Sequence, residues 1–248
     1  MGDIDVTTIE PLSHAEAMAL QAVELERTVS LLRSLEPGDW GAQTDCPDWD
    51  VRQMYLHVLG ACEAGARMRE NVHQLTTARR EHKRRGGPLE AAISGVQVRE
   101  RADTTPEQLR SALLDAGRRG VRARRRLPGL LRALPIPFGP PLGTRPLGYL
   151  TDRIYTRDAW MHRIDIARAT GRALVLTAAH DGRIVADVVA EWARAHRQPH
   201  RLTLTGPAGG TWSAGVGGEE LALDAVEFCR TVSGRATGAG LLAHPVPF

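Results

Sequence analysis

The spacing of apolar residues changes once along the chain, at Gly171, and this change limits the folds that are possible. Before Gly171, apolar side chains recur every three or four residues, as they do on amphipathic helices. After it, residues 201–205 alternate polar and apolar side chains at period two, as in a half-buried strand. The sequence therefore predicts an α+β protein, with a helical unit over residues 1–171 and a small α+β unit over residues 172–248.

Capping motifs predict where the helices of the first unit begin. Ser13 and Glu16 form a capping box that opens a first helix, which we expect to end before Pro37. Further helices are expected after Asp48 or Asp50, after Thr105, and from about Leu147 to Thr170, the last closed by Gly171. Residues 79–88 are polar and basic and predict a loop or a frayed helix end, and the proline-rich run 128–146 interrupts the periodicity.

The second unit shows shorter elements. We expect a short strand over residues 173–176, a helix over 181–196, a β-meander with strands at 201–205, 211–216 and 220–223, and a last helix from Asp224 to about Gly234. The sheet of this unit is therefore predicted to be short and antiparallel.

The charged residues are mostly arginine. Of 32 basic residues Lys83 is the only lysine, and the net charge is only +3. A GC-rich coding sequence explains this bias better than an anionic polymer partner does. Arginines cluster between Arg118 and Arg126, which leaves a nucleic-acid-associated module as an alternative, although a solvated helix face is the favoured interpretation.

No segment has the roughly 18 consecutive apolar residues of a membrane span, and the first thirty residues lack a secretory signal pattern. Cys46, Cys62 and Cys229 are too few and too scattered for a disulfide framework or a CxxC zinc site. We therefore expect a cytoplasmic protein with reduced cysteines and no membrane partner.

Three ionisable residues lie on the apolar face of the helix expected over 147–170. On a helical wheel Asp158, His162 and Asp165 fall inside the apolar arc, whereas Asp152 and Arg163 fall on the opposite face. An unpaired carboxylate in a core costs several kcal/mol or loses its charge, so these groups need a cationic or metallic partner.

The spacing of these residues is compatible with a metal site. Asp158 and His162 are four residues apart and lie side by side on one face. Such pairs are components of metal sites in helical bundles, and Asp165 could orient an imidazole. His57, at the edge of the second helix's apolar stripe, could add a ligand. Two histidines and one carboxylate would leave open positions, as in catalytic metal sites. A buried Asp–His ion pair, or carboxylates paired with an arginine from another helix, would give the same sequence pattern.

Two segments carry a family resemblance. The run T-D-C-P-D-W-D-V-R-Q-M-Y-L-H over residues 44–57 resembles a motif of the mycothiol-dependent maleylpyruvate isomerase family of DinB-like metalloenzymes. The run D-A-W-M-H-R-I-D-I-A-R-A-T-G over residues 158–171 is similar to its second motif, in which glutamate stands where this chain has Asp158. Trp212 and Ser233-Gly234-Arg235 resemble the family's small α+β domain. Residues 72–146 add no motif.

The resemblance implies a four-helix DinB-like bundle that binds a divalent metal, commonly zinc, through His57, Asp158 and His162. It implies mycothiol as a thiol cofactor, with Arg235 facing the site as a candidate clamp for a substrate carboxylate. A cation at a helix C-terminus is the equally weighted alternative for Arg235. Asp158 is one methylene shorter than the family's glutamate.

The expected function is that of a mycothiol-dependent isomerase or S-transferase. A metal would lower the pKa of the thiol, and the thiolate would attack a small electrophilic, carboxylate-bearing substrate. The expected partners are these two small molecules, and the chain is expected to be a monomer or a homodimer. The alternatives are a DinB-like metal-binding protein that does not use mycothiol, and the nucleic-acid-associated module based on Arg118–Arg126.

Overall fold

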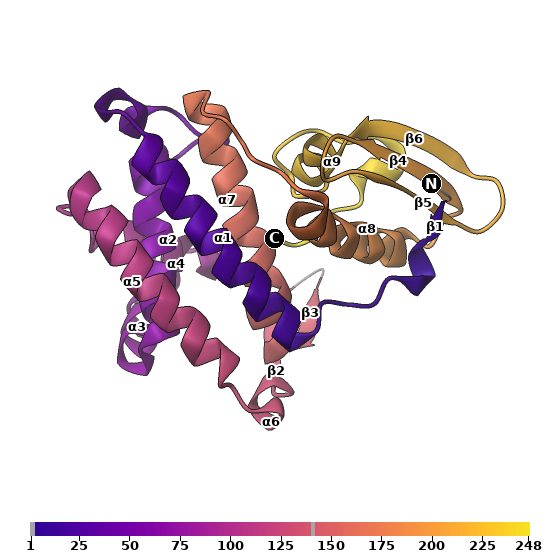
Figure 1. Ribbon diagram of the computed structural model, residues 1–248. Coiled ribbons are helices and arrows are strands. Elements are labelled where there is room, and N and C mark those ends of the chain that lie inside the picture. The colour runs from indigo at the N-terminus through magenta and orange to yellow at the C-terminus, as the bar shows by residue number, and fades with distance from the viewer. Residues whose placement is uncertain (1–2, 140–141) are drawn as a thin grey trace.

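The computed structural model describes residues 3–139 and 142–248, and it has two parts that meet along one helix (Figure 1). The first part is a bundle of long helices, and the second is a small sheet covered by helices. The bundle comprises α1 (His14–Ser34), α2 (Val51–Ala66), α3 (Met68–Arg85), α4 (Leu89–Arg99), α5 (Pro106–Arg125) and α7 (Tyr155–Thr170). The α+β fold class is thus confirmed. None of the described helices is long and apolar enough to span a membrane.

The capping motifs place the helix starts correctly. Ser13, Asp50 and Thr105 each accept a hydrogen bond from the backbone three residues later, and the side chain there accepts one in return. Asp50 therefore caps α2, and Asp48 does not. Gly171 ends α7 in the left-handed conformation, with φ 65°. Local signals of three or four residues are enough to determine these boundaries.

The segment before α5 differs from the prediction. Residues 79–85 are helical and form the end of α3, and only residues 86–88 are a loop. The helix was not evident because only Gln74 and Ala78 are buried on it, so it has no apolar stripe. After α5 the chain forms α6 (Gly129–Arg132), a hairpin of β2 (Pro135–Gly139) and β3 (Gly143–Pro146), and the π-helical turn η3 (Tyr149–Ile154) that leads into α7. Residues 140–141 of the proline-rich run lie outside the described residues.

The sheet of the second part is mixed and is not a meander. Its strands are β1 (Ile4–Asp5), β4 (His200–Thr205), β5 (Gly210–Ala214) and β6 (Glu219–Asp224), in the order β1-β5-β4-β6. The β4–β5 pair is antiparallel, but β6 lies parallel to β4 on its other side. The crossing segment passes so close to β4 that a Cβ on Gly218 would lie 2.0 Å from the Pro199 oxygen. β1 occupies the edge of β5 that a meander would need, so residues near the N-terminus belong to this sheet. The division at residue 171 stays a prediction.

The strand expected over residues 173–176 is absent, since these described residues pair with no other strand. They are an extended linker, and Leu174 packs against both hydrophobic cores. The apolar residues of this segment therefore reflect packing against two cores and not a sheet. Beyond the linker, the turn η4 (Ala178–Gly182) leads into α8 (Arg183–His196), and α9 (Ala225–Val232) begins at its predicted cap, Asp224.

The α7 helix is buried on both faces because it lies between the bundle and the second part (Figure 1). Arg163, on the face opposite the predicted arc, pairs with Glu24 of α1 and Asp181 of η4. Arg157 on the same helix pairs with Asp187 of α8. The polar residues on this face therefore join the two parts instead of meeting water.

A cluster of imidazoles at the end of α8 predicts how stability depends on pH. His196 is buried, and its Nδ1 accepts the Gln198 N–H at 2.9 Å. Burial, with His200 and His244 nearby, lowers the pKa of His196 to about 4. The unfolded chain, with a histidine pKa near 6.5, takes up the proton first, so stability is lost as pH falls below 6.5.

We expect the free energy of unfolding to be about 2 kcal/mol lower at pH 5 than at pH 7 through this group alone. The His196→Asn variant keeps an acceptor for the Gln198 N–H and should lack this component. Urea unfolding at both pH values measures it. An equal pH-dependent loss in the variant and the wild type would contradict the assignment.

Candidate metal centre

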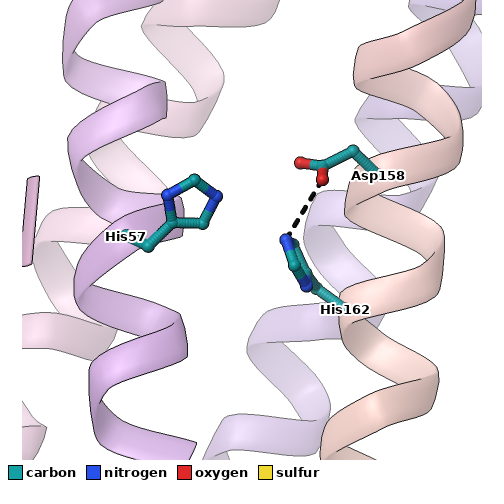
Figure 2. Close-up of side chains that lie close together, drawn as sticks. All are labelled: His57, Asp158 and His162. Carbon is teal, nitrogen blue, oxygen red and sulfur yellow. Dashed lines mark ion pairs between the residues drawn. The ribbon is translucent and has the colours of Figure 1, made fainter. Parts of the chain in front are cut away.

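Three of the predicted site residues lie together inside the bundle (Figure 2). His57 projects from α2 toward Asp158 and His162 of α7, and one ligand atom of each lies within 4.8 Å of the others. His162 Nε2 is 3.1 Å from Asp158 Oδ1, and the two imidazole centroids are 5.4 Å apart at 82°. The i,i+4 spacing on α7 and the phase of α2, set by the Asp50 cap, produce this arrangement.

The donor set fits a divalent metal. His162 Nε2 is buried and makes no well-aligned hydrogen bond within the described ranges, although Asp158 Oδ1 is near. A separation of 3.1 Å is close to the roughly 3.3 Å expected between two ligands of one tetrahedral zinc ion at about 2.0–2.1 Å. The Asp158 side chain is 36% exposed, so the centre is open to solvent on one side. Nitrogen and oxygen ligands with an open side are typical of catalytic zinc sites.

His57 is held by a relay of two glutamines, which lie on α3 and α4. Neither of these helices was predicted from the sequence. Gln97 of α4 donates its amide N–H to Gln74 Oε1 at 2.8 Å, so its own oxygen accepts from His57 Nδ1 at 2.7 Å. Gln74 of α3 in turn donates to the Gly60 carbonyl at 2.9 Å. A Cβ on Gly60 would lie 2.6 Å from Gln97 Cβ, so glycine allows this approach of α4 to α2. The relay leaves His57 Nε2 with a lone pair for a ligand.

Asp165 and Arg235 support the other histidine. Asp165 Oδ2 lies 3.4 Å from His162 Nδ1, and its role in orienting that imidazole stays a prediction. The Arg235 guanidinium binds both oxygens of Asp165 at 2.9–3.0 Å. The carboxylate that Arg235 holds in this structure is therefore one from the protein, 70 residues away in sequence. Its role as a substrate clamp stays a prediction.

The charges of the centre follow from burial and pairing. Burial, with the positive charge of His162 nearby, lowers the pKa of His57 to about 4, so this imidazole is neutral near pH 7. Burial opposes a charge on His162, but the adjacent Asp158 carboxylate outweighs it and raises the pKa of His162 to about 9. The same pair holds the pKa of Asp158 well below its usual range.

A second group with metal-ligand chemistry is satisfied by protein cations. Glu24, His180 and Asp181 are all buried and close together. Arg163 bonds to both carboxylates, and Arg27 and the Trp160 indole N–H bond to Asp181. This cluster is therefore an ion-pair network. Trp160 belongs to it and to the core, whereas the ring of Trp49 packs on His57, with centroids 5.0 Å apart.

The arginines between Arg118 and Arg126 do not all lie on one surface. Arg118 pairs with Glu26 and Arg119 with Asp115, while Arg122, Arg125 and Arg126 are exposed. Arg124 turns inward, between the helices of the bundle. The solvated-face interpretation is thus wrong for this residue, because an i,i+4 pattern of charges does not reveal which arginine faces a neighbouring helix.

Fold and site together define a helical bundle with a candidate metal centre of two histidines and one carboxylate. Residues 22–167, which include all three, match the family model described as the mycothiol maleylpyruvate isomerase N-terminal domain. The chain belongs to this family.

Two solved structures have a similar fold. Both are of a mycothiol-dependent maleylpyruvate isomerase, one of them a mutant, and both are 16% identical to this chain. The alignment with the mutant covers 91% of this chain and 91% of the mutant chain, with a TM-score of 0.57. The alignment with the other structure covers 92% of both chains, with a TM-score of 0.58. No curated protein sequence matches.

Proposed function

We propose that this protein is a mycothiol-dependent isomerase with a divalent metal, zinc in the first instance, held by His57, Asp158 and His162. The observation that supports it most is the convergence of these three ligand atoms within 4.8 Å in a chain of this family. The substrate class we propose is a small electrophile with a carboxylate, as the family's named substrate has.

Each residue has a defined part in this proposal. A bound divalent metal supplies the Lewis acidity that keeps a thiol ionised near neutral pH. His57, neutral because it is buried, offers Nε2, while the Gln97 amide fixes its ring. Asp165 orients His162 and is itself held by Arg235. The exposed edge of Asp158 leaves room for the thiol and the substrate to approach.

A thiol-dependent assay tests the function. Zinc-loaded protein should isomerise maleylpyruvate with mycothiol and should be inactive without it. Release of a stable thiol adduct would instead favour an S-transferase. A folded, zinc-loaded protein that remains inactive with the thiol would contradict the proposal and leave a DinB-like metal-binding protein that does not use mycothiol.

The glutamine relay gives a prediction for metal affinity. Gln97→Leu removes the acceptor for His57 Nδ1 and should weaken zinc binding about 10- to 100-fold, the usual effect of losing an outer-shell hydrogen bond. Gln97→Glu retains an acceptor and should bind zinc as the wild type does. Competition with a chromogenic chelator measures both. Equal zinc affinity in the leucine variant and the wild type would show that the relay does not position His57.

A further inference from the structure

A small cavity lies inside the bundle, next to the candidate metal centre. It has a volume of about 60 Å³ and is lined by residues from α1, α2, α5 and α7, among them Cys62, Arg124, Tyr155 and His162. Since a water needs roughly 10–15 Å³ by such a measure, the cavity has room for about four waters, or for a carboxylate and its neighbouring carbon. Burial raises the pKa of the Cys62 thiol to about 11, so this thiol is uncharged near pH 7. Of Cys62 and Arg124, only Arg124 therefore brings a charge to the cavity.

Arg124 is held in place by uncharged groups. Its Nε donates to Gln21 Oε1 at 2.9 Å, and its guanidinium carbon lies 5.4 Å from the centroid of the Tyr155 ring. Neither terminal nitrogen makes a hydrogen bond or an ion pair with any residue that the structure describes. Two glycines make the space for it, since a Cβ on Gly65 or Gly120 would lie 2.7 or 3.3 Å from Nη1.

This lack of a carboxylate partner distinguishes Arg124 from the arginines of the described chain whose side chains are best covered. The negative charge of Asp152 acts on Arg124 and opposes the fall in its pKa, but this carboxylate is already bound by Arg132 and His14. Burial lowers the pKa of Arg124, as expected for a cation without a counter-ion. Five arginines with well-covered side chains each pair with a carboxylate: Arg101, Arg157, Arg163, Arg230 and Arg235.

The position of Arg124 connects it to the candidate centre. Tyr155, on which it stacks, precedes His162 by seven residues on α7, which is two turns or roughly 10 Å. His162 and Arg124 line the same cavity. A small ligand with a reactive group at one end and a carboxylate at the other would therefore meet complementary groups at both ends.

We propose that Arg124 is a binding residue for a carboxylate of the small molecule that reaches the His57–Asp158–His162 centre, and that it selects for acids. A carboxylate would accept N–H donors from both terminal nitrogens and supply the missing counter-ion. This inference rests on the proposed function only in placing the other end of the ligand at that centre.

Equilibrium binding of maleate to the zinc-loaded protein, measured by calorimetry, tests the proposal without turnover. Arg124→Met should weaken maleate binding at least about tenfold, the loss of one charge-assisted contact. Zinc content and melting temperature should be unchanged. Arg122→Met, an exposed arginine on the same helix, is the control with the same change in charge and should bind maleate as the wild type does.

Further arms separate the possible outcomes. If Arg124→Met weakens mycothiol binding but not maleate binding, the site is an anion site for the cofactor and not for the substrate, which overturns its assignment to acids. Unchanged binding of both molecules would show that Arg124 is only structural. If the methionine variant does not fold, Arg124→Lys replaces it, because lysine keeps the charge but not the paired donors. Arg124→Lys should lose maleate affinity by less than tenfold, but it should bind maleate more weakly than the Arg122→Met control. Because maleate binding requires no catalysis, failure of the thiol-dependent assay would leave this result interpretable.

Discussion

The His162→Gln variant is expected to bind zinc at least about 1000-fold more weakly than the wild type and to lose thiol-dependent turnover to a similar extent. Glutamine fills much of the same space, but its amide is a far poorer ligand than the imidazole Nε2, which is buried and within 3.1 Å of Asp158. Zinc titration with a competing chelator measures the affinity, and the maleylpyruvate assay measures the turnover.

The matched control for that variant is His180→Gln. His180 is also buried beside a carboxylate, Glu24, but it belongs to the ion-pair network. This control should alter stability and leave zinc affinity within about threefold of the wild type. If both variants retained zinc equally well, the metal centre would have to lie elsewhere.

The second large effect concerns stability. Arg163→Met should lower the free energy of unfolding by about 3–5 kcal/mol, because it leaves the fully buried carboxylates of Glu24 and Asp181 without their shared cation. In a chain of this size that is a fall in melting temperature of roughly 10 °C. Arg118→Met, which breaks the exposed pair with Glu26, should cost less than about 1 kcal/mol. Equal effects of the two substitutions in urea unfolding would contradict the role of the Arg163 network.

Features set by neighbouring residues could be predicted from the sequence, and those set by distant contacts could not. The capping boxes at Ser13, Asp50 and Thr105 depend on four residues each, and all three are present. The position of β6 depends instead on β1, some 215 residues away, which occupies the edge that a meander would use. No local pattern carries that information.

The candidate site shows the same division. The helical wheel correctly brought Asp158, His162 and Asp165 to one face, because their spacing on α7 determines it. It did not reveal that the opposite face, with Arg163, is buried too. A helical wheel describes one helix and does not show how many other elements pack against it. Gln97 was missed because it lies on α4, a helix with weak apolar periodicity.

Arg235 and Asp165 were each singled out, yet for different partners. The first was expected to hold a substrate carboxylate and the second to orient an imidazole, and their mutual ion pair spans 70 residues of sequence. This ion pair forms because the second part packs against α7. The sequence pattern of neither segment alone predicts that packing.

The most direct test of the metal centre is elemental analysis of the protein purified without chelator, beside the His57→Ala variant. The wild type should contain about one divalent metal ion per chain, and the variant should contain much less while remaining folded. A folded wild type that contains no stoichiometric divalent metal, and that takes none up from added zinc, would contradict the central claim.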